Sequence, residues 1–278
     1  MRARGLPVAN RSAALTAAAA LAPVALVSMA ALLHETRVAT LVLLVAGFLI
    51  VRRGEGVEVG AWAAAIPIGL ILTLALAPRP PEAVPGAYCT TPLQPFTVYR
   101  ILEAGWALAA LAIVVPLVRA GTAELGLRRP SLRMAGIGFV GALVVAPVAL
   151  IVAPPLSEPF FGPLPIRTDD PAALVPAILY ALVNAVTEEV IYRGALLALL
   201  ARSVGVPVAI VAQAVVFGLV HGASPDYVGS SLPVIAVMTI GGIIAGIAVV
   251  RTRSLVLPIA LHIAFDIPLY YGNACLTN

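Results

Sequence analysis

Residues 172–201 read AALVPAILYALVNAVTEEVIYRGALLALLA, an apolar run that carries two glutamates and one arginine near its middle. The run exceeds the about 20 residues that a helix needs to cross the hydrocarbon core of a bilayer. On insertion scales a charged side chain at the centre of a membrane helix costs at least about 2.5 kcal/mol, and such residues usually have a function. Glu188, Glu189 and Arg193 therefore need partners, a purpose or both.

The composition of the whole chain supports a membrane environment. Hydrophobic residues make up 61% of the 278 residues and charged residues 11%, and the mean hydropathy is +1.05. Soluble domains are typically about 45–50% apolar and about 25% charged. The formal net charge of +4 does not predict a nucleic-acid partner, because the arginines lie between apolar runs instead of forming a patch.

Apolar runs recur along the chain at lengths that suit membrane spans. We expect spans, the second of them the shortest, at 12–33, 38–51, 57–77, 97–118, 134–153, 172–201, 206–222, 232–250 and 254–272. The fold class is therefore all-α, a polytopic transmembrane bundle of about eight or nine spans. With the N-terminus inside, 12 of the 17 arginines fall on the inner side, which is the usual bias of membrane proteins. We expect a prokaryotic plasma-membrane protein with a cytoplasmic N-terminus and an external C-terminus.

The chain divides into two regions by its motifs. Residues 1–133 hold spans without an interpretable motif, whereas 134–278 hold the polar residues described below, with the motifs in 172–271. Cys89 and Cys275 fall on the same side of the predicted topology. A disulfide between them and two unrelated thiols are both compatible with the sequence.

Helical spacing suggests how the charges of 172–201 are arranged. Residues four apart share a helix face, so Glu189 can pair with Arg193 while Glu188 lines up with Asn184 and Tyr192. Adjacent helical residues point about 100° apart. We therefore expect an ion pair at Glu189 and a Glu188 side chain that faces a cavity.

Two of the three histidines lie within or at the edge of later apolar runs. His221 ends one run, and His262 lies in another with Asp266 one turn later. A buried carboxylate and an imidazole can together activate a water molecule, and a second imidazole can stabilise an oxyanion. We expect no cofactor; the alternative is zinc held by Glu188, His221 and His262, although no HExxH spacing occurs.

Small residues cluster in the run 232–250. Gly242 and Gly246 are four residues apart, and Gly241 and Ala245 repeat the spacing one position earlier. Such a pattern is typical of close helix packing in membranes, so we assign it no catalytic role.

The polar residues form three motifs in a fixed order. They are Glu188-Glu189-x-x-x-Arg193, Phe217-x-x-x-His221 and His262-x-x-x-Asp266. Together they resemble the CPBP family, also called Abi, which comprises CAAX prenyl endopeptidases and bacteriocin-processing or immunity proteins. The resemblance covers roughly Ala172 to Tyr271.

The resemblance implies a CAAX-protease-like helical core with a hydrolytic site inside it. It assigns water activation to Glu188 with His221 as partner, oxyanion support to His262 and Asp266, an accompanying ion pair to Glu189 and Arg193, and packing to Phe217. The last motif often ends in asparagine in the family. An ionised aspartate cannot donate a hydrogen bond, so here Asp266 is better suited to orienting His262.

Three functions are compatible with these patterns. The leading one is a glutamate-type intramembrane endopeptidase that cuts a peptide or protein in or near the membrane. A non-catalytic immunity or scaffold protein of the same fold is the first alternative. A proton-coupled transporter is the second, although no inverted repeat relates the two halves.

Overall fold

The structure is a computed structural model of the chain. It describes residues 13–54, 56–76, 95–128, 130–161, 174–223 and 231–274, with side chains left undescribed at 95–96, 153–161 and 269–274. Cys89 and Cys275 lie outside the described residues, so their pairing stays open.

The described residues fold into helices joined by turns and contain no strand. The elements are α1 (Ala13–Leu32), the 3₁₀ helix η1 (His34–Thr36), α2 (Arg37–Arg52), α3 (Val59–Leu74), α4 (Pro95–Leu117), α5 (Leu132–Phe161), α6 (Leu174–Glu188), the π-helix η4 (Glu189–Leu196), α7 (Leu197–Val204), α8 (Val206–Gly222), α9 (Leu232–Thr252) and α10 (Val256–Ala274). Helices satisfy their own backbone hydrogen bonds, which is why they dominate apolar chains in lipid. The all-helical prediction is confirmed for this part of the chain.

Six helices of the described chain are long and apolar enough to cross a membrane. They are Ala13–Leu32, His34–Arg52, Thr97–Leu117, Leu132–Val152, Leu174–Val204 and Leu232–Thr252. The apolar helices at Val59–Leu74, Val206–Gly222 and Val256–Pro268 are shorter. Nine helical segments thus lie where nine spans were predicted, and six of them reach spanning length.

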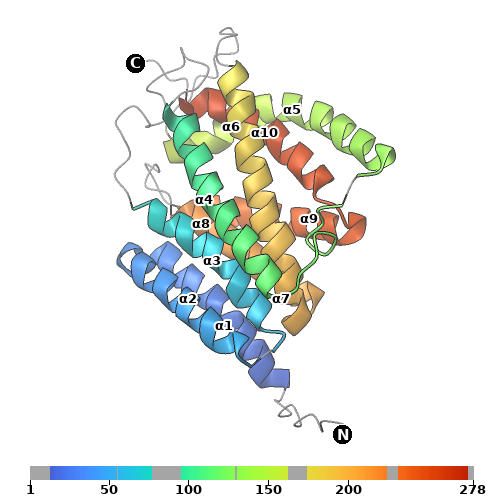
Figure 1. The fold of residues 1–278 in the computed structure, drawn as a ribbon. Coiled ribbons are helices and arrows are strands. Elements are labelled where there is room, and N and C mark those ends of the chain that lie inside the picture. The colour runs from blue at the N-terminus through green and yellow to red at the C-terminus, as the bar shows by residue number, and fades with distance from the viewer. Residues whose placement is uncertain are drawn as a thin grey trace, which may run out of the picture.

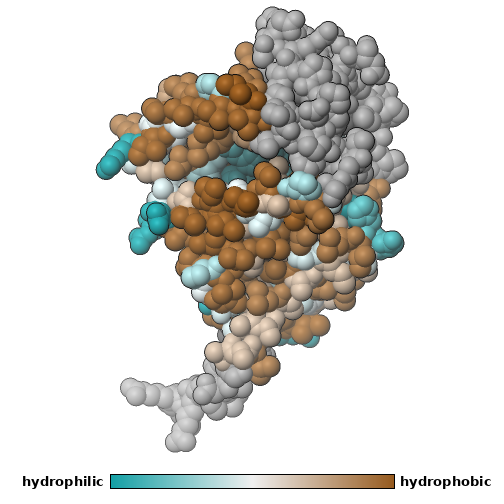
Figure 2. Space-filling view, turned by 180° about the vertical axis from the view of Figure 1, so that it is seen from behind, coloured by the Kyte–Doolittle hydropathy of each residue, from teal (hydrophilic) through white to brown (hydrophobic). Residues whose placement is uncertain are grey.

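Large apolar side chains cover the outside of the bundle. Among the many exposed large hydrophobic residues, Trp106 is 64% exposed and Leu132 is 94% exposed. Figure 2 shows hydrophobic residues over most of the coloured part of the face in view. Soluble monomers rarely expose contiguous apolar patches above a few hundred Å², so the protein is an integral membrane protein.

The predicted sixth span is a single continuous helical rod with an irregular centre. It consists of α6, η4 and α7, and the backbone widens to a π-helix directly after Glu188. Periodicity alone predicted a regular α-helix through this segment, so that part of the expectation is wrong. π-helical turns are rare and occur frequently at functional sites.

The rod of α6 and η4 lies at the centre of the bundle. Figure 1 shows α4 and α6 next to each other, and the two helices are in contact. Every residue of η4 is buried, and η4 contacts α3, α4, α8 and α9. The charges of this segment are therefore enclosed by helices from both halves of the chain.

Helices α8 and α9 pack closely through the glycines of α9. A Cβ on Gly242 would lie 2.9 Å from the Ala214 Cβ, and one on Gly246 would lie 3.0 Å from the Gln213 amide nitrogen. A Cβ on Gly241 would meet nothing within 4 Å. The predicted close packing is thus present at Gly242 and Gly246, and Gly241 takes no part in it.

Helix α5 extends away from the centre of the bundle. It contacts α10 extensively, and only 11% of the residues in the apolar stretch of Leu132–Val152 are buried. Figure 2 shows a hollow on the rear face with hydrophilic residues visible inside it, framed by apolar surface. The bundle is therefore not sealed by apolar residues on that side.

Candidate active site

Glu188 is the last residue of α6, and its two carboxylate oxygens have different surroundings. Oε1 accepts a hydrogen bond from Arg100 Nη2 at 2.8 Å. Oε2 lies 3.6 Å from Nε2 of His221 and 3.6 Å from Nε2 of His262, and it has no hydrogen-bond partner within the described chain. The side chain is 10% exposed. One oxygen is thus anchored, while the other faces two imidazoles.

His221 lies one residue before the end of α8. Its Nδ1 is 2.8 Å from the carbonyl oxygen of Phe217. A carbonyl only accepts hydrogen bonds, so Nδ1 carries a proton and donates it. In the neutral ring Nε2 then holds a lone pair directed toward Glu188, the arrangement of a proton acceptor.

Phe217 packs the site as well as supplying this carbonyl. Its ring centroid lies 4.2 Å from that of His221 and 5.0 Å from that of Tyr192. The guanidinium carbon of Arg193 lies 4.0 Å from the Phe217 centroid, within the range of a cation–π contact. The phenyl ring therefore separates His221 from Arg193 and contacts both.

His262, on α10, is held between carboxylates. Nδ1 lies 2.9 Å from Glu189 Oε1, while Nε2 lies 3.5 Å from Asp266 Oδ1 and 3.6 Å from Glu188 Oε2. A protonated ring can donate to acceptors on both sides. Glu189 therefore orients the imidazole of His262. Helical spacing within one span could not predict this contact, because the two residues lie on different helices.

Glu189 also forms the predicted ion pair with Arg193. Arg193 Nη1 lies 3.3 Å from Glu189 Oε1, and both side chains are 2% exposed. One oxygen thus faces a guanidinium and an imidazole at once. This arrangement neutralises the Glu189 carboxylate and fixes the side that it presents to His262.

Asp266 is tied to α6 by a second contact. Its Oδ2 accepts a hydrogen bond from Asn184 Nδ2 at 2.8 Å, and the residue is 6% exposed. Asn184 lies one turn before Glu188 and faces the same neighbour, α10. The Asn184 bond holds Asp266 Oδ1 beside His262 Nε2, so the carboxylate is placed to orient that ring.

Arg100 is the site residue that the sequence did not identify. It lies on α4, 88 residues before Glu188, and its second partner is Glu103, one turn later. The sequence signal was an ionisable pair with i,i+3 spacing at the start of an apolar run. Nothing in that signal indicates which later helix α4 contacts.

Zinc stays the alternative for this site. Within the described residues no group of three or more His, Cys, Asp or Glu side chains is arranged to hold a metal ion. The donor types suit zinc, with Glu188 Oε1 bound to Arg100 and Oε2 facing both imidazoles. The chelator experiment below tests this alternative.

Comparison with known proteins gives one match, to a family model. No curated protein and no solved structure matches the chain. A family model described as type II CAAX prenyl endopeptidase Rce1-like matches residues 170–268, a segment that contains all three motifs and ends beyond Asp266. The match agrees with the resemblance carried by the motifs, and residues 170–268 are similar to the Rce1-like CAAX prenyl endopeptidases.

Proposed function

We propose that the protein is an intramembrane endopeptidase that hydrolyses a peptide bond with water activated by Glu188 and His221. The observation that carries this proposal is the buried Glu188 Oε2. It has no hydrogen-bond partner among the described residues and faces imidazole nitrogens on α8 and α10. Buried polar atoms are rarely left without a partner unless a water, an ion or a catalytic role explains them.

A water molecule fits this geometry as the nucleophile. Two acceptors 3.6 Å apart, such as Glu188 Oε2 and His221 Nε2, can both lie at a hydrogen-bonding distance of about 2.8 Å from one water oxygen. The water then donates one proton to each acceptor. Its lone pairs point away from both and toward a bound substrate carbonyl.

The chemical step follows from this placement. The water oxygen bonds to the carbonyl carbon, and one water proton moves to Glu188 Oε2 as the carbonyl becomes a tetrahedral oxyanion. The N–H of a protonated His262 Nε2 lies near enough to Glu188 Oε2 to serve the same reacting centre and to stabilise the oxyanion. Removal of one such donor typically lowers kcat by about 10²–10³-fold.

Collapse of the tetrahedral intermediate completes the reaction. The C–N bond breaks, the carbonyl re-forms, and the proton held by Glu188 moves to the leaving amine. The products are a carboxylic acid, which keeps the second proton of the water, and an amine; transfer of that proton to the amine gives a carboxylate and an ammonium, and Glu188 returns to its ionised form. Glu189, Asp266 and Arg100 take no part in bond changes and act as positioning residues.

The substrate class follows from the location and the family match. A site enclosed by apolar helices suits a peptide or protein in or near the bilayer, and the matching family is named for CAAX prenyl endopeptidases. We propose such a membrane-associated peptide as substrate. The experiment below determines which peptide sequence is cleaved and whether a prenyl group is needed.

The test compares wild type, Glu188→Gln and the control Glu35→Gln, whose residue is exposed, all purified in detergent. The substrates are quenched fluorescent peptides with C-terminal CAAX-like ends, prenylated and unprenylated, each with and without a chelator. We expect cleavage by wild type and by the control, insensitive to chelation, and a loss of at least about 100-fold in Glu188→Gln.

Other outcomes would redirect the assignment. Full activity in Glu188→Gln would overturn the glutamate mechanism, whereas loss on chelation would restore the zinc alternative. A folded wild type that cuts none of the peptides would favour the non-catalytic immunity or scaffold function.

A further inference from the structure

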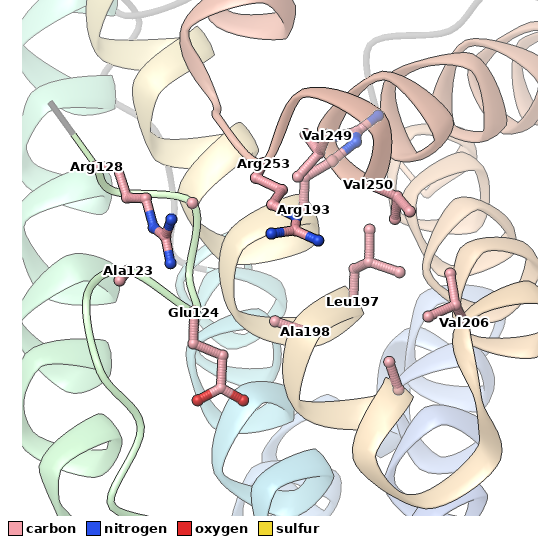
Figure 3. Close-up of a pocket in the computed structure, with 12 residues that line it drawn as sticks. Ala123, Glu124, Arg128, Arg193, Leu197, Ala198, Val206, Val249, Val250 and Arg253 are labelled. Atoms are coloured by element: carbon pink, nitrogen blue, oxygen red, sulfur yellow. The ribbon is translucent and has the colours of Figure 1, made fainter. Parts of the chain in front are cut away.

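A pocket of about 350 Å³ opens at the end of the bundle where α4 and α9 end and α8 begins. Its walls come from the loop after α4, from η4 and α7, from the start of α8 and from the end of α9 (Figure 3). This end carries the arginine-rich loops of the chain. The pocket is distinct from the water-activating pair Glu188 and His221, neither of which lines it.

The charged lining of the pocket is predominantly positive. Arg128 and Arg253 are exposed, and neither forms an ion pair with another described residue. Arg193 is 2% exposed, so the pocket leads from exposed arginines to a buried one. Nη1 of Arg193 lies 3.3 Å from Glu189 Oε1 in the ion pair described above, whereas its Nε has no hydrogen-bond partner within the described chain. A buried N–H without a partner indicates a ligand or water that accepts a hydrogen bond from it.

The one carboxylate in the lining is already neutralised. Both oxygens of Glu124 accept hydrogen bonds from Arg202, at 2.6 Å each, in a bidentate pair of the strong kind. Arg202 also donates to the carbonyl of Val118 at 3.2 Å. The Glu124 carboxylate therefore does not cancel the positive charge that Arg128 and Arg253 provide.

The walls of the pocket are apolar and held in place. Leu197, Ala198, Ala201, Val206, Val249 and Val250 line it. The backbone N–H of Leu255 donates to the Gly126 carbonyl at 3.3 Å, which fixes the loop after α4 to the turn between α9 and α10. A fixed cavity with cationic and apolar walls suits an amphipathic anion.

We propose that this pocket binds the phosphate group of an anionic phospholipid, with the glycerol and acyl region against its apolar wall. Arginine forks match phosphate oxygens, and basic pockets between membrane helices bind lipid headgroups. A free phosphate ion shares the headgroup chemistry but would leave the apolar wall uncovered. The apolar lining therefore favours the lipid as the source of the phosphate.

The chain offers a matched pair of variants for the test. Arg128→Gln/Arg253→Gln removes two charges from the pocket. Arg119→Gln/Arg251→Gln removes two exposed charges from the loop after α4 and the last turn of α9, both outside the lining. Neither pair touches the candidate active site. Both variants and wild type are reconstituted with phosphatidylcholine alone or with added phosphatidylglycerol, and lipid binding is measured by native mass spectrometry and by the thermal unfolding midpoint.

Each arginine near a headgroup contributes a factor of about five in affinity, so the pocket variant should bind phosphatidylglycerol about 30-fold more weakly than wild type. It should also lose the rise in unfolding midpoint that phosphatidylglycerol produces, while the control keeps both. The single variants Arg128→Gln and Arg253→Gln should each weaken binding about fivefold, which preserves the test if the double variant does not fold.

Equal binding by the pocket variant and the control would overturn the proposal, since the effect would then be general surface charge. A separate measurement with inorganic phosphate alone tests whether the pocket binds a free phosphate ion instead of a lipid. Failure of millimolar phosphate to displace phosphatidylglycerol or to stabilise wild type supports the lipid. Displacement and stabilisation by phosphate, lost in the pocket variant, would overturn the lipid as the source.

Discussion

Arg100 holds one oxygen of Glu188 and thereby directs the other toward the imidazoles. It is a cation on α4, outside the segment that matches the Rce1-like family. Its guanidinium binds Glu103 and Glu188 at the same time. We infer that Arg100 is a positioning residue that the N-terminal helices supply to the site.

The prediction for Arg100 concerns turnover more than substrate binding. Arg100→Met should lower kcat by up to about 100-fold, because a displacement of about 1 Å at a catalytic group can have that effect, while KM changes less. Arg100→Lys keeps the charge without the fork and should restore part of the activity. Steady-state kinetics with Arg119→Met as the control would check this, and an unchanged kcat in Arg100→Met would remove the positioning role.

Glu189 and Arg193 should be coupled in stability. Both side chains are 2% exposed, and removing one partner of a buried ion pair typically costs about 3–5 kcal/mol because the other charge is left uncompensated. Glu189→Gln and Arg193→Gln should each lower the unfolding midpoint clearly, and the double variant should lose less than the sum. Thermal unfolding of wild type, the two single variants and the double variant completes a double-mutant cycle. Strictly additive losses of stability would show that Glu189 and Arg193 do not interact.

At the scale of elements, the π-helix η4 separates the surroundings of two adjacent glutamates. Glu188 ends the regular helix and faces Nε2 of both histidines, whereas Glu189 starts η4 and binds Nδ1 of His262. The adjacent residues Glu188 and Glu189 thereby contact opposite nitrogens of the His262 ring. The local backbone irregularity and the polar cluster occur at the same place.

The spacing between α8 and α9 also depends on single residues. Gly242→Ala would place a Cβ 2.9 Å from the Ala214 Cβ and 3.0 Å from its Cα, so the helices must separate and α8 must move with His221. We expect a lower unfolding midpoint and reduced cleavage in Gly242→Ala. Gly241→Ala is the matched control, and its open surroundings should leave stability equal or slightly raised, since alanine favours helix by up to about 1 kcal/mol. Equal effects of the two variants would contradict the close packing.

At the scale of the whole molecule, the site is assembled from both predicted regions. Helices α1, α3 and α4 contact α8, η4 and α6 respectively, and Arg100 reaches Glu188 from α4. The N-terminal helices therefore cover and complete the core, although their own sequence carries no interpretable motif. The division at 133–134 remains a prediction about motifs.

A truncated chain tests this dependence directly. Residues 134–278 expressed without 1–133 lack Arg100 and expose the faces of α6, η4 and α8 that the N-terminal helices cover. We expect loss of cleavage and an unfolding transition that is broadened or absent, measured beside the full chain in the same detergent. An active and stable 134–278 would show that the N-terminal helices are dispensable.

The amino-acid sequence was sufficient for the fold class and indicated most residues of the candidate site. Long apolar runs locate membrane helices because lipid offers no other partner for backbone N–H and C=O groups. The pair Glu189 and Arg193 followed from i,i+4 spacing, which the helix backbone itself imposes. The motif residues Glu188, His221 and His262 stood out because ionisable groups are rare within apolar spans.

Tertiary packing decided the remaining contacts of the site. The bonds from Arg100 to Glu188 and from Glu189 to His262 join residues 88 and 73 positions apart, and no local periodicity specifies which helices meet or how they rotate. The π-helix η4 was not predicted either, since such turns are rare; it is buried and contacts α3, α4, α8 and α9. Lipid as solvent sets the position of each helix along the chain, and side-chain packing between helices determines which charges face one another.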